Sequence, residues 1–167
     1  MTHAELSACP EMTKEDAKKE YLFVCTGNTC RSPMAAALFN FLFNDSDAVA
    51  ASAGIAADTS PISEKAKNAL MERGVLPIPG SDYRYHVSRM ITDRMIESAN
   101  LVICMTSAHA MRLMMAYPAY ASKIAVMPHD IPDPYGGSMD DYKMCLSAIE
   151  KGLNEAFGEK TETPRDE

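Results

Sequence analysis

The residues from Cys25 to Ser32 bring together side chains that can act jointly on a phosphate ester. They read Cys-Thr-Gly-Asn-Thr-Cys-Arg-Ser. A thiolate at Cys25 can attack phosphorus and form a cysteinyl-phosphate intermediate. The planar guanidinium of Arg31 can bind two phosphate oxygens and follow the charge that develops in the transition state. Ser32 is placed to donate a hydrogen bond to the sulfur as it departs.

The same segment has the composition of an anion-binding loop. A tight loop before a helix offers converging backbone N–H groups, here from Thr26 to Arg31, and the positive end of the helix dipole. Gly27 and Asn28 tolerate the unusual backbone angles that such wrapping needs. Pro33 suits the first turn of the helix that follows. The same positive potential favours a thiolate at Cys25.

The elements around this loop alternate between short apolar runs and helix-prone segments. Ser63 and Thr92 are candidate helix caps, and Gly74 is a candidate helix end. The pattern predicts strands at 21–24, 48–53, 101–105 and 123–127 and helices at 34–43, 63–73, 92–99, 107–117 and 138–157. Such alternation predicts an α/β fold of the doubly wound kind, with a four-stranded parallel sheet covered by helices on both faces. Ligands of such sheets bind beyond the carboxyl ends of the strands, where the loop after the first strand lies.

The chain length fits one domain, since 167 residues can bury a core without disulfides or metals. We expect an N-terminal extension at 1–20, the domain at 21–158 and a C-terminal tail at 159–167. The helix at 107–117 carries Met111, Met114 and Met115, which we expect to fill the core.

Charge and cysteine usage restrict the classes of partner. The 16 Lys and Arg against 23 Asp and Glu give a net charge of −7, which argues against a nucleic-acid partner. The polar N-terminus and the short apolar runs predict neither a secretory signal nor a membrane span. An odd number of scattered cysteines, five in all, favours the reducing cytoplasm over a disulfide framework. Cys25 and Cys30 could form half of a zinc site, but no second pair stands at zinc spacing, so neither a metal nor another cofactor is expected.

On these motifs the chain resembles the low-molecular-weight protein-tyrosine phosphatase family, whose signature is C-x5-R-S at a strand-to-helix junction. The resemblance covers roughly residues 21 to 157. It includes Cys25 to Ser32, Ser52 to Gly54, His86 with Ser88 and Thr92, Ile103 to Met105, and Asp133 to Tyr135. It implies a phosphatase that acts on phosphorylated proteins and releases inorganic phosphate.

The resemblance also implies roles for residues outside the loop. Asp133 is implied as the general acid that protonates the leaving group and later activates water, because a phenolate with a pKa near 10 leaves slowly without a proton. Asp130 is the alternative acid, or a residue that caps a turn. The resemblance implies that a hydrogen bond between the side chains of Asn28 and Ser52 braces the loop. It implies His86 as a second such brace. The phosphate-binding and supporting set is thus Thr26, Gly27, Asn28, Thr29, Cys30, Ser32, Ser52 and His86.

Two substrates remain open. Members that act on phosphotyrosine line the pocket with several aromatic rings, whereas here Tyr135 is followed by Gly136. A bacterial branch that hydrolyses phosphoarginine resembles this chain in the threonine at Thr29 and in the run from Asp133 to Ser138. A carboxylate such as Asp58 would suit a cationic, planar guanidinium. We therefore expect phosphoarginine, phosphotyrosine or both as substrates.

Two rivals and one regulatory hypothesis complete the expectations. A thioredoxin-coupled arsenate reductase would need two further cysteines. Cys104 matches the first of them, but Met111 stands where the second is expected. A phosphate-binding module without turnover would not need Cys25 or Asp133. Cys30 allows a reversible disulfide that shelters Cys25 from over-oxidation, or is a small packed residue of the loop.

Overall fold

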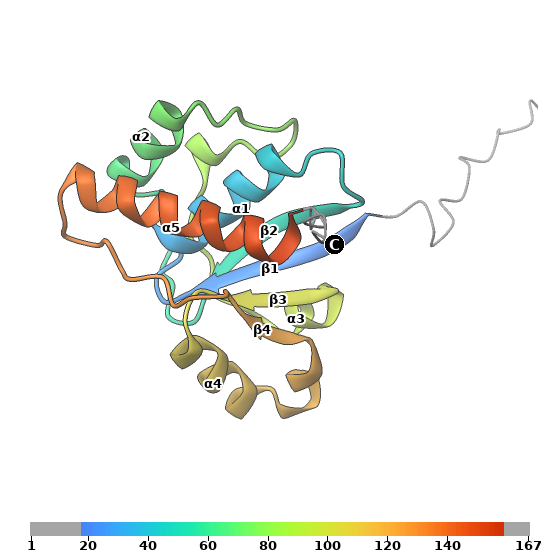
Figure 1. The fold of residues 1–167 in the computed structure, drawn as a ribbon. Coiled ribbons are helices and arrows are strands. Elements are labelled where there is room, and N and C mark those ends of the chain that lie inside the picture. Colours follow the sequence, from blue (N-terminus) through green and yellow to red (C-terminus); the bar gives the residue numbers. More distant parts are fainter. Residues whose placement is uncertain (1–17, 159–167) are drawn as a thin grey trace, which may run out of the picture.

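The structure, a computed structural model, describes residues 18–158 and forms one parallel sheet with helices around it (Figure 1). The predicted tail at 159–167 and most of the predicted extension lie outside the described residues. The sheet has the order β2-β1-β3-β4. Its strands are β1 (Lys19–Cys25), β2 (Ala48–Gly54), β3 (Leu101–Cys104) and β4 (Ile124–Val126).

Helices cover both faces of the sheet, as predicted. The helices are α1 (Arg31–Leu42), α2 (Glu64–Arg73), α3 (Asp93–Ser98), α4 (Ser107–Ala116) and α5 (Met139–Phe157), with short 3₁₀ helices η1 (Tyr83–Tyr85) and η2 (Pro118–Lys123). In Figure 1, α1, α2 and α5 lie on one side of the sheet and α3 and α4 on the other. The order of the strands reverses direction next to β1, so the loop after β1 opens at the position where such sheets bind ligands.

The first strand is longer than predicted. It begins at Lys19 rather than Tyr21, because Lys19 pairs with Ala48 and its N–H donates to the Asp47 carbonyl at 2.7 Å. At its other end, Cys25 pairs with Gly54, and Val24 pairs with Cys104 of β3. The nucleophile candidate therefore leaves the sheet between its two neighbouring strands.

Local signals set most helix ends. Gly74 ends α2 in the left-handed conformation with φ 84°, and Thr92 caps α3 by accepting from the Met95 N–H. Ser63 differs from the prediction, since it precedes α2 but makes no side-chain cap there. Its hydroxyl instead donates to the Tyr142 hydroxyl on α5 at 3.3 Å. A tertiary contact has replaced the local one.

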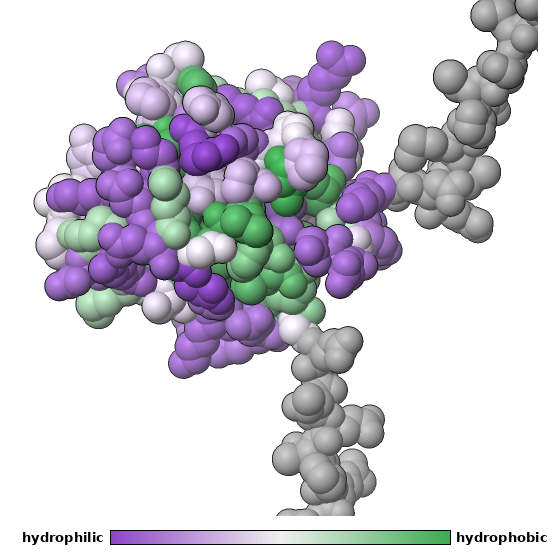
Figure 2. Space-filling model, turned by 90° about the horizontal axis from the view of Figure 1, so that it is seen from above, coloured by the Kyte–Doolittle hydropathy of each residue, from purple (hydrophilic) through white to green (hydrophobic). Residues whose placement is uncertain are grey.

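The two apolar clusters of the core lie on opposite faces of the sheet. The larger packs under α1, α2 and α5 and the smaller under α3 and α4. The larger cluster includes an aromatic group near the amino ends of the strands, formed by Tyr21, Phe39, Phe43 and Phe157 with ring centroids 5.1 to 6.2 Å apart. Figure 2 looks down on the layer that covers this cluster, and its surface is mostly hydrophilic with one apolar area near the C-terminal end of α5. The apolar side chains of the layer thus turn mainly inward.

The prediction for the methionines of α4 is wrong for two of three. Met111 is 64% exposed and Met115 is 81% exposed, whereas Met114 packs against the smaller cluster. The helix buries only one stripe, which includes Ala110 and Leu113. Met111 and Met115 share the opposite side, because residues four apart lie on one helix face.

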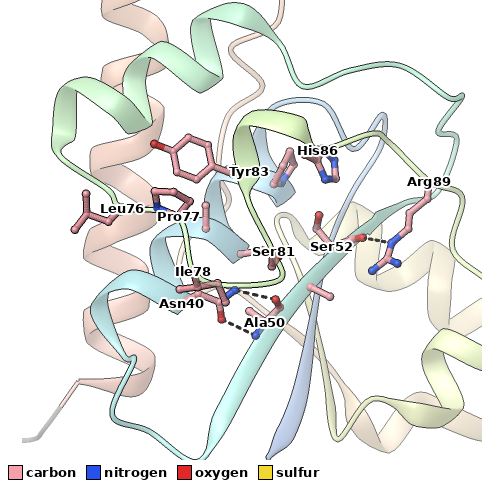
Figure 3. A pocket seen from close by; sticks show the side chains of 14 residues that line it. Asn40, Ala50, Ser52, Leu76, Pro77, Ile78, Ser81, Tyr83, His86 and Arg89 are labelled. Atoms are coloured by element: carbon pink, nitrogen blue, oxygen red, sulfur yellow. Dashed lines mark hydrogen bonds between the residues drawn. The ribbon is translucent and has the colours of Figure 1, made fainter.

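Side chains cover the edge of β2 that pairs with no other strand of the sheet. Asn40 of α1 donates to the Ala50 carbonyl at 3.0 Å and accepts from the Ala50 N–H at 2.8 Å (Figure 3). The Nε of Arg89 donates to the Ser52 carbonyl at 2.9 Å. These bonds satisfy backbone groups that would otherwise invite another strand, and they fix the part of β2 that carries Ser52.

Among the helices of residues 18–158, none combines the length and the apolar character that crossing a bilayer requires.

Candidate active site

The loop between β1 and α1 is shaped to surround an anion. Asn28 sits in it with φ 57°, the single non-glycine residue of the described chain with a positive φ. Cys30 is the N-cap of α1 but makes no side-chain cap. Within residues 18–158, the backbone N–H groups of Thr29, Cys30 and Arg31 have no protein acceptor. They remain available to an anion at the positive end of α1.

The sulfur of Cys25 receives hydrogen bonds from within this loop. It lies 2.9 Å from the Ser32 hydroxyl and 3.2 Å from the Asn28 backbone N–H, which donates to it. The Ser32 oxygen accepts from the Asn28 amide at 2.8 Å, and its own proton has two acceptors within reach, the sulfur at 2.9 Å and the Ala53 carbonyl at 3.5 Å, of which the sulfur is the nearer. The sulfur is thus held in place by two groups of its own loop.

Arg31 and Asp133 meet beside the loop. The Arg31 side chain is buried, and its Nη1 donates to the Ile131 carbonyl at 3.1 Å while Nη2 lies 3.6 Å from Oδ2 of Asp133. Asp133 is half exposed, and its Oδ1 accepts from the Tyr135 N–H at 3.1 Å. The Ile131 carbonyl therefore fixes the Arg31 guanidinium, and the half-exposed Asp133 carboxylate lies where the cavity opens to solvent.

Asp130, the alternative acid, is used elsewhere. One oxygen of its carboxylate accepts from both the N–H and the hydroxyl of Ser107 at the start of α4, at 2.9 and 2.8 Å. These bonds hold the pKa of Asp130 below its ordinary value, so it keeps a proton less readily. It does not line the cavity above Cys25. The geometry favours Asp133 as the acid.

Asn28 is the centre of a buried network that braces the loop. Its amide donates to the hydroxyls of Ser32 and Ser52, at 2.8 and 3.0 Å. Its Oδ1 accepts from the Arg89 N–H at 3.0 Å, and its carbonyl lies 2.9 Å from Nε2 of His86. The structure thus brings Ser52 and His86 to the positions expected of the two braces. Burial is the main cause that lowers the pKa of His86.

The cavity over the loop has a volume of about 490 Å³. Most predicted site residues line it, whereas Ser32, Ser52 and His86 lie behind its wall. Its lining consists of Cys25, Thr26, Gly27, Asn28, Thr29, Cys30, Arg31, Asp58, Ser60, Pro61, Ser63, Asp133 and Tyr135. The predicted nucleophile, the predicted phosphate-binding groups and the predicted acid therefore share one cavity.

The sequence profile of the low molecular weight phosphotyrosine protein phosphatase family matches residues 20–164. The chain belongs to this family. It is 34% identical over 146 residues to a protein-arginine-phosphatase of Bacillus subtilis, covering 81% of this chain and 93% of that protein. It is 32% identical over 136 residues to the low molecular weight protein-tyrosine-phosphatase PtpB of Staphylococcus haemolyticus, covering 76% and 89%.

A solved structure extends the likeness to the fold. A mutant of the YwlE arginine phosphatase with a phosphorylated active-site serine in place of cysteine superposes with a TM-score of 0.74 at 33% identity, covering 82% of this chain and 92% of that one. This chain is accordingly a low molecular weight protein phosphatase, a phosphoric monoester hydrolase.

The geometry of the phosphatase weakens the arsenate reductase alternative. Cys104, the candidate for the first further cysteine, is fully buried in β3, and burial raises the pKa of its thiol to about 12. Met111 at the second position is not a cysteine. The expected second cysteine of a disulfide relay is therefore lacking at position 111.

Three supporting residues of the phosphatase were not found from the sequence. Arg89 binds Asn28 and Ser52, as above. Tyr142 of α5 places its hydroxyl 3.4 Å from Sγ of Cys30, and burial is the main cause that raises its pKa to about 12. His109 of α4 lies 2.8 Å from the hydroxyl of Thr26. No local pattern marks them, since each acts on a loop at least 60 residues away in sequence.

A second, smaller cavity of about 200 Å³ lies behind the loop, between β2, α1 and the segment from Leu76 to Ser81 (Figure 3). Ser52, His86 and Arg89 contribute to its wall, as Figure 3 shows. The braces of the phosphate loop therefore separate two cavities. Among residues 18–158, no group of three or more His, Cys, Asp or Glu side chains could hold a metal ion.

Proposed function

We propose that this phosphatase hydrolyses phosphoarginine in proteins, with Cys25 as nucleophile, Arg31 as transition-state clamp and Asp133 as acid and base. The composition of the cavity carries the proposal: it presents the carboxylate of Asp58 and a single aromatic ring, that of Tyr135. A carboxylate can bind the planar cation of a substrate guanidinium through charge-assisted hydrogen bonds. The identity to a protein-arginine-phosphatase supports the same choice.

The proposed reaction uses each group in turn. The Cys25 thiolate attacks phosphorus, the P–N bond breaks, and Asp133 gives its proton to the departing guanidine nitrogen. Loop N–H groups and Arg31 hold the phosphate oxygens. Asp133 then takes a proton from water, which attacks the cysteinyl phosphate. Phosphate departs, and the Ser32 hydroxyl donates to the sulfur as the thiolate returns. The phosphorylated serine in the relative's mutant supports such an intermediate.

Two side chains are proposed to set the substrate preference. Thr29 lines the cavity, with Oγ1 3.7 Å from Sγ of Cys30 and therefore directed along the loop. Asp58 is exposed, and its Oδ1 accepts from the Ser60 hydroxyl at 2.6 Å. That bond leaves the other carboxylate oxygen free for a guanidinium of the substrate.

The test compares phosphoarginine and phosphotyrosine peptides as substrates of the wild type, Thr29→Ile and Asp58→Asn. We expect each variant to lower kcat/KM for phosphoarginine relative to phosphotyrosine by about tenfold, the loss of one charge-assisted contact. The matched control is Asp45→Asn, an exposed carboxylate outside the cavity, which should leave the ratio unchanged. A wild type that ignores phosphoarginine would end the proposal and leave phosphotyrosine as the substrate.

We further propose a cytoplasmic site of action, with residues 21–158 as the phosphatase domain, 1–20 as an extension whose last two residues, Lys19 and Glu20, add to strand β1, and 159–167 as a tail. The four cysteines of the described chain, Cys25, Cys30, Cys104 and Cys145, are all free thiols, which supports a reducing compartment. Phosphorylated proteins are the proposed partners and inorganic phosphate the product.

A further inference from the structure

His109, in the first turn of α4, is held at both ring nitrogens although it is only 6% exposed. Its Nε2 lies 2.8 Å from Oγ1 of Thr26, and its Nδ1 lies 2.9 Å from Oγ1 of Thr106. The backbone N–H of His109 also donates to the Thr106 hydroxyl, at 3.3 Å. The ring therefore connects the start of α4 to the phosphate loop across 83 positions of the sequence.

Thr26 directly follows the nucleophile Cys25. Its carbonyl accepts from the Ala56 N–H at 2.9 Å, and its hydroxyl has one partner within residues 18–158, the ring of His109. The network of Asn28 holds the other part of the loop from the side of β2. The loop is thus fixed from two sides, and His109 is the support on the side of α4.

The surroundings of the His109 ring favour its neutral form. Burial, followed by the positive charges of Arg31 and Arg112, lowers the pKa of His109 to about 4, although Asp133 and Asp130 act in the opposite direction. A neutral imidazole has one donor and one acceptor nitrogen. One of its two threonine partners therefore donates to it and the other accepts, so the ring orders both hydroxyls.

We propose that His109 is a positioning residue for phosphate hydrolysis: its imidazole fixes the Thr26 side chain and, through it, the peptide that joins Thr26 to Cys25. The ring touches no reacting atom. Its effect comes from geometry, since displacement of a reacting group by about 1 Å can cost two orders of magnitude in rate. The inference holds for either leaving group, because it concerns the loop and not the substrate pocket.

The test is a double-mutant cycle on the full chain with p-nitrophenyl phosphate as substrate. Thr26→Val removes the hydroxyl and keeps the shape, and His109→Phe keeps a ring without nitrogens. We expect each to lower kcat about tenfold, with KM changed by less than about threefold. The double variant should be no worse than either single one, because both remove the same hydrogen bond. His109→Gln, which can reach Thr26 with an amide, should recover most of the loss.

Two further measurements separate positioning from packing. His129→Phe is the matched control, because His129 is a largely exposed histidine paired with Glu155 far from the loop in sequence, and its kcat should not change. The ratio of wild-type to Thr26→Val kcat should stay constant between pH 5 and 7, where a ring with a pKa of about 4 remains neutral.

The outcomes that would overturn the inference are distinct. Full kcat in Thr26→Val, additive losses in the double variant, or a wild-type to variant ratio that slopes across this pH range would each refute it. If His109→Phe does not fold, a comparison of kcat between Thr26→Val and Thr26→Ser tests the inference without it. A tenfold loss in the valine variant with a retained rate in the serine variant supports the inference, and equal rates refute it.

Discussion

The two ends of the β-sheet are stabilised by different kinds of contact. At the amino ends of the strands, Tyr21, Phe39, Phe43 and Phe157 form an aromatic group whose energy comes from apolar burial and ring packing. At the carboxyl ends, buried polar side chains join the phosphate loop to β2 and α4. Apolar attraction is non-directional, whereas hydrogen bonds depend on the direction of the groups that make them and therefore fix the geometry of the loop. We therefore expect the first end to supply stability, and the second end to supply stability together with the proposed catalytic geometry.

The change with the largest expected effect is Cys25→Ser, which alters only the carboxyl end of the sheet, where the phosphate loop lies. We expect kcat to fall by more than about 10⁴-fold, because the hydroxyl is a far weaker nucleophile than the thiolate. Phosphate should still raise the melting temperature, since the loop N–H groups remain. Steady-state assays and thermal shift with phosphate measure the two effects. Turnover near the wild-type rate would refute the assignment of Cys25 as the nucleophile.

Asp133→Asn is expected to have the next largest effect. The kcat for a poor leaving group should fall by about 10² to 10⁴, because no proton reaches the departing atom. The loss should be much smaller for p-nitrophenyl phosphate, whose leaving group needs little protonation. Asp130→Asn is the matched control, and it should retain most of the activity. A larger loss in the Asp130 variant would reverse the assignment of the acid.

Phe39→Ala tests the opposite end of the sheet. Removing this fully buried ring should lower the free energy of unfolding by about 3 to 5 kcal/mol. At a temperature where the variant is folded, kcat should match the wild type. Urea denaturation measures the stability and a steady-state assay measures kcat. Tyr85→Ala, which removes an exposed aromatic ring, is the control and should leave the stability almost unchanged. A lower kcat in the folded variant would contradict the idea that the aromatic end of the sheet contributes to stability and not to catalysis.

Asn28 allows conformation and hydrogen bonding to be separated at one position. Asn28→Gly and Asn28→Ala both delete the side-chain bonds, so both should lower kcat by about tenfold or more. Only alanine strains the backbone at φ 57°, and its variant should be less stable than the glycine variant by about 1 kcal/mol. Equal unfolding midpoints in urea would show that the left-handed conformation carries no cost.

The smallest expected effect concerns protection of the nucleophile. If Cys30 forms a reversible disulfide with Cys25 on oxidation, Cys30→Ser should regain less activity after peroxide and thiol treatment than the wild type, each relative to its own starting rate. Mass spectrometry of Cys25 should then show more sulfinic and sulfonic acid in the variant. Equal recovery would count against protection.

The sequence was most informative where function lies in neighbouring residues. The loop from Cys25 to Ser32 carries its proposed nucleophile and its arginine within one strand-to-helix junction, so the local pattern was enough to predict the site. Thr92 and Gly74 acted as the expected cap and stop because these signals depend on backbone groups within a few residues. Ser63 did not, because Tyr142 offered its hydroxyl a tertiary partner.

By itself, the sequence determined the alternation of strands and helices and the parallel sheet with helices on both faces, because both follow from periodicity. It also predicted the chemistry of the phosphate loop, because that prediction rests on contiguous residues. Only the tertiary structure decided the strand order, the buried stripe of α4 that leaves Met111 and Met115 exposed, and the supports from Arg89 and His109. Their partners lie 61 and 83 residues away along the chain. Such contacts are set by how the elements pack, a property that no local segment encodes.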